Sequence, residues 1–150
     1  MAVAIGLACR IVDVSADGAH GEHFAYGSPG NETDVTRVVE VRAFDDLRFT
    51  PSKLEVRRGE TVRFLVSNAG RVRHEFSIGD RAGQREHARL MREHPGMVHG
   101  DSANTVVIEP GETKSLIWKF DKRPPGPIEI ACHVGGHYEG GMKIAVRWPK

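Results

Sequence analysis

Three side chains near the end of the chain have the types and the spacing of a transition-metal site. Cys132, His137 and Met142 follow one another in the pattern C-x4-H-x4-M, directly after an apolar run at residues 128–131. Thiolate, imidazole and thioether groups are the ligands that copper prefers. Four glycines stand between these residues, so the segment can fold back and bring the three side chains to one point. The spacing therefore predicts a copper site on this loop.

The loop alone leaves one side of such a site open, so a further ligand has to come from elsewhere in the chain. His74 is the candidate, because it stands at the start of a predicted strand, before Glu75 and Phe76. His133 is not included, since its side chain points away from that of Cys132 if strand geometry continues through the pair. Zinc is the alternative metal, but structural zinc sites usually add a second thiolate or imidazole rather than a thioether.

A second group of ligand-type residues, His94, Met97 and His99, forms the pattern H-x2-M-x-H. It predicts a second, weaker site for Cu(I), the copper ion that thioethers favour. His87 and Met91 lie four residues apart just upstream. The alternative is that Met97 packs over the first site while the histidines face solvent.

Short β-type runs separated by turn residues fill the chain from residue 35 onward. Seven or eight short strands at this spacing indicate an all-β fold, a Greek-key β-sandwich rather than a βαβ fold. The predicted strands are residues 35–43, 54–56, 61–67, 74–78, 105–108, 115–120, 128–131 and 142–146.

One segment between these strands has a helical pattern instead. Arg81, Arg85, Arg89 and Arg92 repeat at helical spacing in a stretch without proline. We expect one inserted helix within about residues 82–94, running from Gln84 to about residue 93. Its arginines are predicted to form a solvated face, and a docking patch for an acidic partner is the alternative.

The composition limits the remaining classes of function. The chain has 150 residues, 39% of them hydrophobic, which fits a single domain. A formal net charge of +1 gives no support to nucleic-acid binding, and no apolar run is long enough to span a bilayer. Two cysteines argue against a fold built on disulfides, although a bond between Cys9 and Cys132 is an alternative to the metal site.

Residues 1–30 are predicted to be a flexible lead-in or the remnant of an export signal, and residues 31–150 the folded domain. Residues 2–8 are apolar, but no Lys or Arg precedes them, and small residues at 16–19 could form a cleavage region. Export is expected on this basis. His20 and His23 are interpreted as part of a solvated tail, with a loose metal-binding arm as the alternative.

Beyond the four candidate ligands, several segments resemble the cupredoxin, or type 1 blue-copper, family. They are Phe49-Thr50-Pro51, Arg58-Gly59-Glu60-Thr61-Val62, His74-Glu75-Phe76 and Pro110-Gly111-Glu112. The chain is most similar to periplasmic cupredoxins associated with copper tolerance, in which segments like residues 94–99 and 136–139 recur. The resemblance covers residues 35–146. It implies a cupredoxin-like sandwich holding one type 1 copper, with His74, Cys132 and His137 as equatorial ligands and Met142 as a weak axial ligand.

Two residues depart from the family pattern. Many cupredoxins have Asn or Ser after the first histidine ligand, where this chain has Glu75. A proline common between the cysteine and histidine ligands is replaced by Gly135 or Gly136. These differences leave open how the thiolate is hydrogen-bonded and how strongly Met142 couples to the metal.

The resemblance implies an exported mononuclear copper protein rather than an enzyme. Its expected role is one-electron transfer, through transient docking of a redox partner near His137, or copper tolerance by copper buffering or Cu(I) handling. The alternative is a copper-dependent Cu(I) oxidase or a reductase with a second copper site. Such reductases connect the centres through a histidine on the N-terminal side of the ligand cysteine, where this chain has Ala131.

Overall fold

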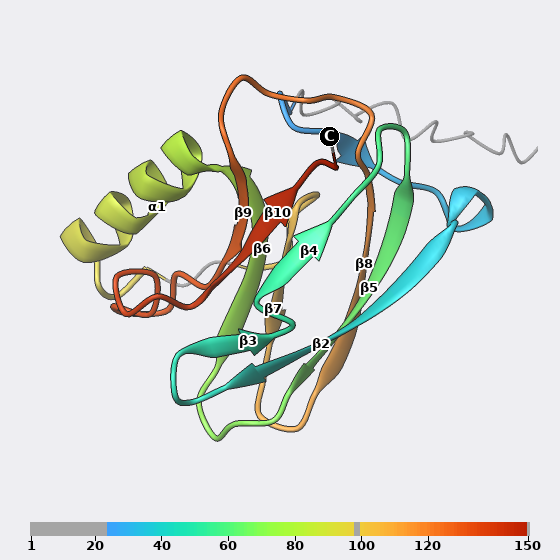
Figure 1. Ribbon diagram of the computed structural model, residues 1–150. Coiled ribbons are helices and arrows are strands. Elements are labelled where there is room, and N and C mark those ends of the chain that lie inside the picture. Colours follow the sequence, from blue (N-terminus) through green and yellow to red (C-terminus); the bar gives the residue numbers. More distant parts are fainter. Residues whose placement is uncertain (1–23, 98–99, 150) are drawn as a thin grey trace, which may run out of the picture.

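The computed structural model describes residues 24–97 and 100–149, which form two facing five-stranded sheets (Figure 1). The first sheet has the order β1-β8-β5-β2-β3, and the second has the order β4-β10-β9-β6-β7. In chain order the elements are β1 (Ser28–Pro29), the 3-10 helix η1 (Glu32–Asp34), β2 (Arg37–Phe44), β3 (Arg48–Thr50), β4 (Lys53–Glu55), β5 (Thr61–Asn68), β6 (His74–Asp80), α1 (Arg81–Glu93), β7 (Thr105–Ile108), β8 (Thr113–Lys119), β9 (Ile128–Ala131) and β10 (Lys143–Arg147).

This architecture confirms the predicted all-β sandwich with one inserted helix. Two short strands, β1 with two residues and β3 with three, were not predicted. Sheet neighbours are often distant in sequence: β2 pairs in parallel with β5, and β10 pairs in parallel with β4. The last strand of the chain is therefore held by a strand from its first half.

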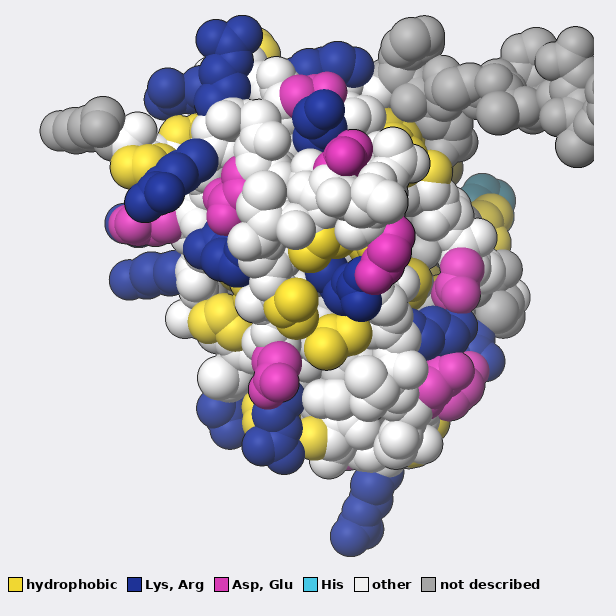
Figure 2. Space-filling view, turned by 90° about the vertical axis from the view of Figure 1, so that its right-hand side faces the viewer, with side chains coloured by type: hydrophobic (Ala, Val, Ile, Leu, Met, Phe, Trp, Pro, Cys, Tyr) yellow, Lys and Arg dark blue, Asp and Glu magenta, His cyan; other side chains and the backbone are white. Residues whose placement is uncertain are grey.

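The core lies between the sheets and follows from the alternation of apolar residues along the strands. Val62, Phe64 and Val66 on β5 are fully buried, and Phe76 on β6 packs 5.2 Å from Phe64, centroid to centroid. Burial of each such side chain contributes about 1.5–3 kcal/mol. The outward-facing positions carry mixed charge, and Figure 2 shows basic and acidic side chains interspersed on one face with small, separate hydrophobic groups.

Helix α1 begins earlier than predicted. It spans Arg81–Glu93 rather than starting at Gln84, because the Asp80 carboxylate accepts a hydrogen bond from the Gly83 backbone N–H at 2.7 Å and caps the first turn. His94 is the C-terminal cap rather than the last helical residue. The helix lies outside the sandwich against β6 and β9 (Figure 1). Among the described residues, no helix has the length and apolar character needed to cross a membrane.

Residues 24–30, which were predicted to belong to the lead-in, contact the sandwich. Phe24 and Tyr26 pack on Trp118, with ring centroids 5.2 and 5.7 Å from the indole. Strand β1 then pairs with β8, and Gly30 donates a backbone hydrogen bond to Ile117. The sandwich therefore begins before residue 31, while the candidate signal, Cys9, His20 and His23 lie outside the described residues.

Candidate metal centre

Three of the predicted ligands meet at one end of the sandwich. His74 begins β6, Cys132 directly follows β9, and His137 lies in the loop between β9 and β10. Each offers one donor atom, and these atoms all lie within 4.8 Å of one another. His74 and Cys132 are fully buried, and His137 is half-buried. The arrangement brings a thiol and two imidazoles together from two separate parts of the chain.

The spacing of the donors fits a single metal ion. The Cys132 Sγ atom lies 3.9 Å from His74 Nδ1 and 3.4 Å from His137 Nδ1. With metal–sulfur and metal–nitrogen bonds of about 2.3 and 2.0 Å, as zinc makes, two ligands at trigonal angles lie roughly 3.7 Å apart. The observed separations bracket this value. An ion can therefore bind between the three donors with little rearrangement.

The loop from Cys132 to Met142 is shaped by two consecutive turns. The His137 N–H donates to the Val134 carbonyl at 2.8 Å, and the Gly140 N–H donates to the Gly136 carbonyl at 3.0 Å. Gly136 has φ of +80°, a conformation that side-chain-bearing residues rarely adopt. Glycine at this position therefore allows the chain to reverse and return His137 to the cysteine.

Met142 is placed beside the three donors by its own backbone. Its N–H donates to the His137 carbonyl at 2.9 Å, and its carbonyl accepts from the Cys132 N–H at 3.1 Å. The side chain is fully buried in the core cluster that also contains Cys132. Its role as a weak axial ligand stays a prediction, supported by this tethering to both neighbouring ligands.

Asp45 orients His74, and its role was not predicted from the sequence. Its Oδ1 atom lies 3.2 Å from His74 Nε2, which leaves Nδ1 directed toward Cys132. The Asp45 carboxylate also accepts the Arg71 backbone N–H at 2.7 Å, and this bond is the main reason that the pKa of Asp45 lies below its usual value. No local spacing marks Asp45, because it reads as an ordinary residue of the turn after β2.

Asn68 fixes the segment that leads to His74. Its side-chain amide donates to the Val72 carbonyl at 2.7 Å and to the Ile108 carbonyl at 3.0 Å, and its carbonyl oxygen accepts from the Gly70 N–H at 2.8 Å. In the sequence Asn68 only follows the strand predicted at residues 61–67. In the structure its buried side chain links the segment before β6 to the end of β7.

The thiol of Cys132 is strongly desolvated. Burial raises its pKa to about 12, although the backbone N–H groups of Glu75, at 3.3 Å from Sγ, and Val134 favour the thiolate. A metal ion binds the deprotonated sulfur, and the positive charge of the bound ion stabilises the thiolate in this pocket. Burial and the neighbouring His74 lower the pKa of His137, which favours the neutral ring that coordinates metals.

The backbone N–H of Glu75 contacts the Cys132 sulfur, whereas the Glu75 side chain lies on the other face of β6. The residue is 3% exposed, and burial raises the pKa of its carboxyl group to about 7. The carboxylate accepts the backbone N–H of His133, but its Oε1 atom has no hydrogen-bond partner among the described residues. The departure from Asn or Ser thus leaves the hydrogen bond to Cys132 in place.

His133 lies on the helix side of β9, away from the donor cluster, as strand alternation predicts. Its Nε2 atom is 2.5 Å from Gln84 Oε1, and its ring stacks on those of Tyr138 and His87 at 5.1 and 4.2 Å between centroids. Gln84 also donates to the backbone carbonyls of Ser77 and Glu129. This layer attaches α1 to the sheet behind the metal-binding loop.

The second predicted group is only partly described. His94 caps α1 and is exposed, Met97 is 42% exposed, and His99 lies outside the described residues. The cluster of metal-binding groups found among the described residues does not include His94. Site formation by this trio stays a prediction.

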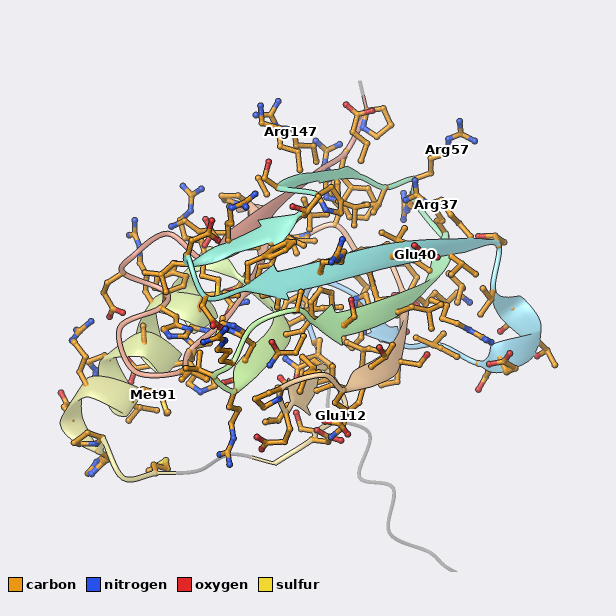
Figure 3. All side chains as sticks on the ribbon, turned by 90° about the horizontal axis from the view of Figure 1, so that it is seen from below. Arg37, Glu40, Arg57, Met91, Glu112 and Arg147 are labelled. Carbon is orange, nitrogen blue, oxygen red and sulfur yellow. The ribbon has the colours of Figure 1, made fainter. Side chains whose placement is uncertain are left out.

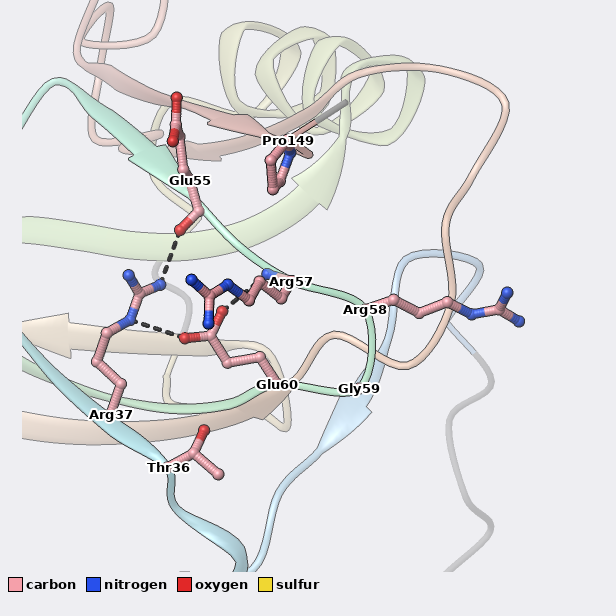
Figure 4. A pocket seen from close by; sticks show the side chains of 8 residues that line it. All are labelled: Thr36, Arg37, Glu55, Arg57, Arg58, Gly59, Glu60 and Pro149. Atoms are coloured by element: carbon pink, nitrogen blue, oxygen red, sulfur yellow. Dashed lines mark hydrogen bonds and ion pairs between the residues drawn. The ribbon is translucent and has the colours of Figure 1, made fainter.

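Another hollow of the described surface lies away from the donor cluster. A groove of about 730 Å³ is lined in part by Arg37, Arg57 and Glu60, at the end opposite α1 (Figures 3 and 4). Arg37 bonds the Glu55 carbonyl at 2.8 Å and pairs with Glu60 at 2.9 Å, and the Arg57 N–H bonds Glu60 at 2.8 Å. These pairings hold the turn between β4 and β5.

Solved structures with the same fold include cupredoxins. Auracyanin B aligns with a TM-score of 0.63 and 23% identity over 83% of this chain and 96% of its own. The auracyanin of Roseiflexus castenholzii aligns with a TM-score of 0.61 and 19% identity over 77% of this chain and 98% of its own. At these identities the similarity establishes the cupredoxin fold. No family model matches the chain.

Sequence relatives are closer. The copper-resistant cuproprotein CopI of Rubrivivax gelatinosus is 42% identical over 131 residues, covering 86% of this chain and 78% of the relative. The protein of the same name from Pseudomonas aeruginosa is 36% identical over 155 residues, covering 85% and 83%. Both matches cover at least 85% of this chain. The chain therefore belongs to the CopI family of copper-resistant cuproproteins.

Proposed function

We propose that this protein binds one copper ion as a type 1 centre through His74, Cys132 and His137, with Met142 as the axial ligand, and acts in copper tolerance. The observation that carries the proposal is the convergence of the three donor atoms within 4.8 Å at a largely buried position. The names of its relatives support copper as the metal and tolerance as the role.

The donor set favours copper over zinc. Two imidazoles and one thiolate suit both metals, but the fourth tethered side chain is the thioether of Met142, a soft ligand. Structural zinc sites are completed by a further thiolate, imidazole or carboxylate instead. Among the described residues, the cluster within ligand distance contains one cysteine and no carboxylate.

The protein's own contribution is to hold the donors in fixed positions. Asp45 orients His74, the Glu75 N–H contacts the sulfur, and the two loop turns hold His137. When bound, copper supplies a one-electron redox change, and a preformed site limits the movement of ligands that accompanies it. We propose that electron exchange with a partner protein occurs at His137, because this ligand is half-buried beside the exposed Gly135 and Gly136.

The proposed location is the periplasm, where a copper-tolerance protein would meet incoming metal. The short apolar run at residues 2–8 motivates this proposal. Cell fractionation of the full chain tests it, and recovery in the cytoplasm would contradict it. Deletion of the gene is expected to lower growth at elevated copper, and a chain carrying Cys132→Ser is not expected to restore it.

Spectroscopy of the copper-loaded protein tests the centre itself. Cu(II) loading is expected to give intense visible absorption from thiolate-to-copper charge transfer, and Cys132→Ser is expected to abolish that band. His94→Ala is the control, because His94 is an exposed imidazole outside the cluster. A Cu(II) form without the band, or a band that survives Cys132→Ser, would contradict the proposed centre.

A further inference from the structure

A second cavity lies on the other side of β6 from the donor cluster. It has a volume of about 180 Å³ and is bounded by β6, the end of α1 with the turn that follows, and the start of the metal-binding loop. Figure 3 shows Met91 at the end of α1 that borders this region. The lining residues are Arg73, Glu75, Met91, Pro95, Met97, Val107, Val134 and Gly135.

The wall of this cavity contains a buried carboxylate without a full set of partners. Glu75 is 97% buried by accessible area, and Oε1 has no hydrogen-bond partner among the described residues. Buried polar atoms in native proteins are nearly always paired, so an unpaired oxygen on a residue that lines a cavity indicates a missing cation or donor. Arg73, which also lines the cavity, does not fill this role through its Nε atom, which bonds Glu109 at 2.8 Å.

Two thioethers line the same small volume. Met91 is half-buried on α1, and Met97 follows the helix with 42% of its surface exposed. Thioether sulfur is a soft ligand that selects Cu(I) over harder cations. A singly charged ion would be neutralised by one carboxylate, whereas a divalent ion would leave an uncompensated charge in a site walled mainly by Pro95, Val107 and Val134.

We propose that Glu75, Met91 and Met97 form a second metal site in this cavity, which binds Cu(I) through one carboxylate oxygen and two thioether sulfurs. The site differs from the predicted trio His94, Met97 and His99, with which it shares only Met97. It also differs from the type 1 centre, which lies across the backbone of β6. The Glu75 N–H nevertheless contacts Cys132 Sγ, so the two ions would be held by adjacent groups of one strand.

Cu(I) stoichiometry of the intact protein tests this site. Under anaerobic conditions with a chromogenic Cu(I) chelator as competitor, native mass spectrometry is expected to show two Cu(I) ions per wild-type chain. Met91→Leu and Met97→Leu, which keep size and remove sulfur, are each expected to reduce the count to one and leave the Cu(II) visible band unchanged. Glu75→Gln is expected to remove the same ion, and Glu93→Gln, a charge change on the exposed face of α1, should retain both.

The outcomes separate this site from the type 1 centre and from the predicted trio. Cys132→Ser is expected to lose the visible band and keep the cavity ion, so that failure of either site is recognised independently. A single Cu(I) in the wild-type chain would overturn the inference, as would two ions in the Met91→Leu variant. Loss of the second ion in His94→Ala or His99→Ala, with retention in Met91→Leu, would place it at the trio instead.

Discussion

Two buried histidines differ in what surrounds them: His74 begins β6, and His133 lies just after the neighbouring strand β9. Each has Nε2 occupied by a side chain, Asp45 at 3.2 Å for His74 and Gln84 at 2.5 Å for His133. His74 directs its other nitrogen at a thiol 3.9 Å away, between the sheets. His133 is stacked between two rings beneath α1. Burial and hydrogen bonding are thus similar, and only the presence of a second donor group makes one of them a candidate ligand.

The largest effects are expected from removing each imidazole in turn. His74→Ala should lower copper affinity by more than about 100-fold, beyond the loss typical of residues that only support a ligand, while the metal-free protein stays folded. His133→Ala should keep the visible band and lower the free energy of unfolding by about 2–4 kcal/mol, since it opens a cavity and unpairs Gln84. Copper titration and urea denaturation of the metal-free proteins measure the two effects.

The distinction between the two histidines fails if His74→Ala and His133→Ala change copper binding and the free energy of unfolding in the same way. Loss of the band in His133→Ala, with the fold intact, would assign that histidine to the metal as well. His94→Ala, which removes an exposed imidazole, should change neither quantity.

A smaller effect is expected at the residue that orients His74. Asp45→Ala should lower copper affinity by about 10–100-fold, the range for residues that hold a ligand in place. Asp46→Ala is the matched control, because Asp46 is exposed and pairs with Arg48 instead. Equal affinities in the two variants, measured by competition with a copper chelator, would show that His74 is oriented by its packing alone.

A change of the axial side chain should alter the copper without removing it. Met142→Gln is expected to retain copper and shift both the visible band and the reduction potential, because a weak axial ligand tunes the metal more than it holds it. Voltammetry of the two proteins measures the shift. Complete loss of copper would mean that Met142 is not a weak ligand, whereas Met97→Leu should leave the potential unchanged.

The smallest effect is expected where α1 contacts the metal-binding loop. Arg92 pairs with Glu139 at 2.5 Å, and both side chains are exposed. Arg92→Ala should lower the free energy of unfolding by no more than about 1 kcal/mol, as for other exposed ion pairs. A larger loss in urea denaturation would mean that the helix is held to the loop from outside rather than through Gln84 and His133.

The parts of the site that the sequence predicted are the local ones. Cys132, His137 and Met142 are close in the chain, and a strand followed by a glycine-containing loop is sufficient to bring them together. His74 was assigned through its likeness to a family framework, because its distance from Cys132 along the chain gives no local pattern. The sandwich itself followed from the alternation of apolar residues along strands such as β5.

The supporting contacts were not predictable in the same way. Asp45 and Asn68 looked like turn residues, and Gln84 looked like the start of a helix, yet each bonds groups far away in sequence. Such partners depend on which strands become neighbours, and a single sequence does not reveal this. The unpaired Oε1 of Glu75 was hidden for the same reason, since the cavity that Glu75 lines is built from segments far apart in sequence.

The sequence separation of 58 positions between His74 and Cys132 has a consequence for the lifetime of the protein. Because β6 and β9 must pair before the two donors meet, chains in which this pairing is open cannot hold the ion between them. Copper then stabilises the native state but not the states in which β6 and β9 are not yet paired. It therefore slows unfolding without accelerating folding. The loaded molecule is expected to resist proteolysis longer than the empty one.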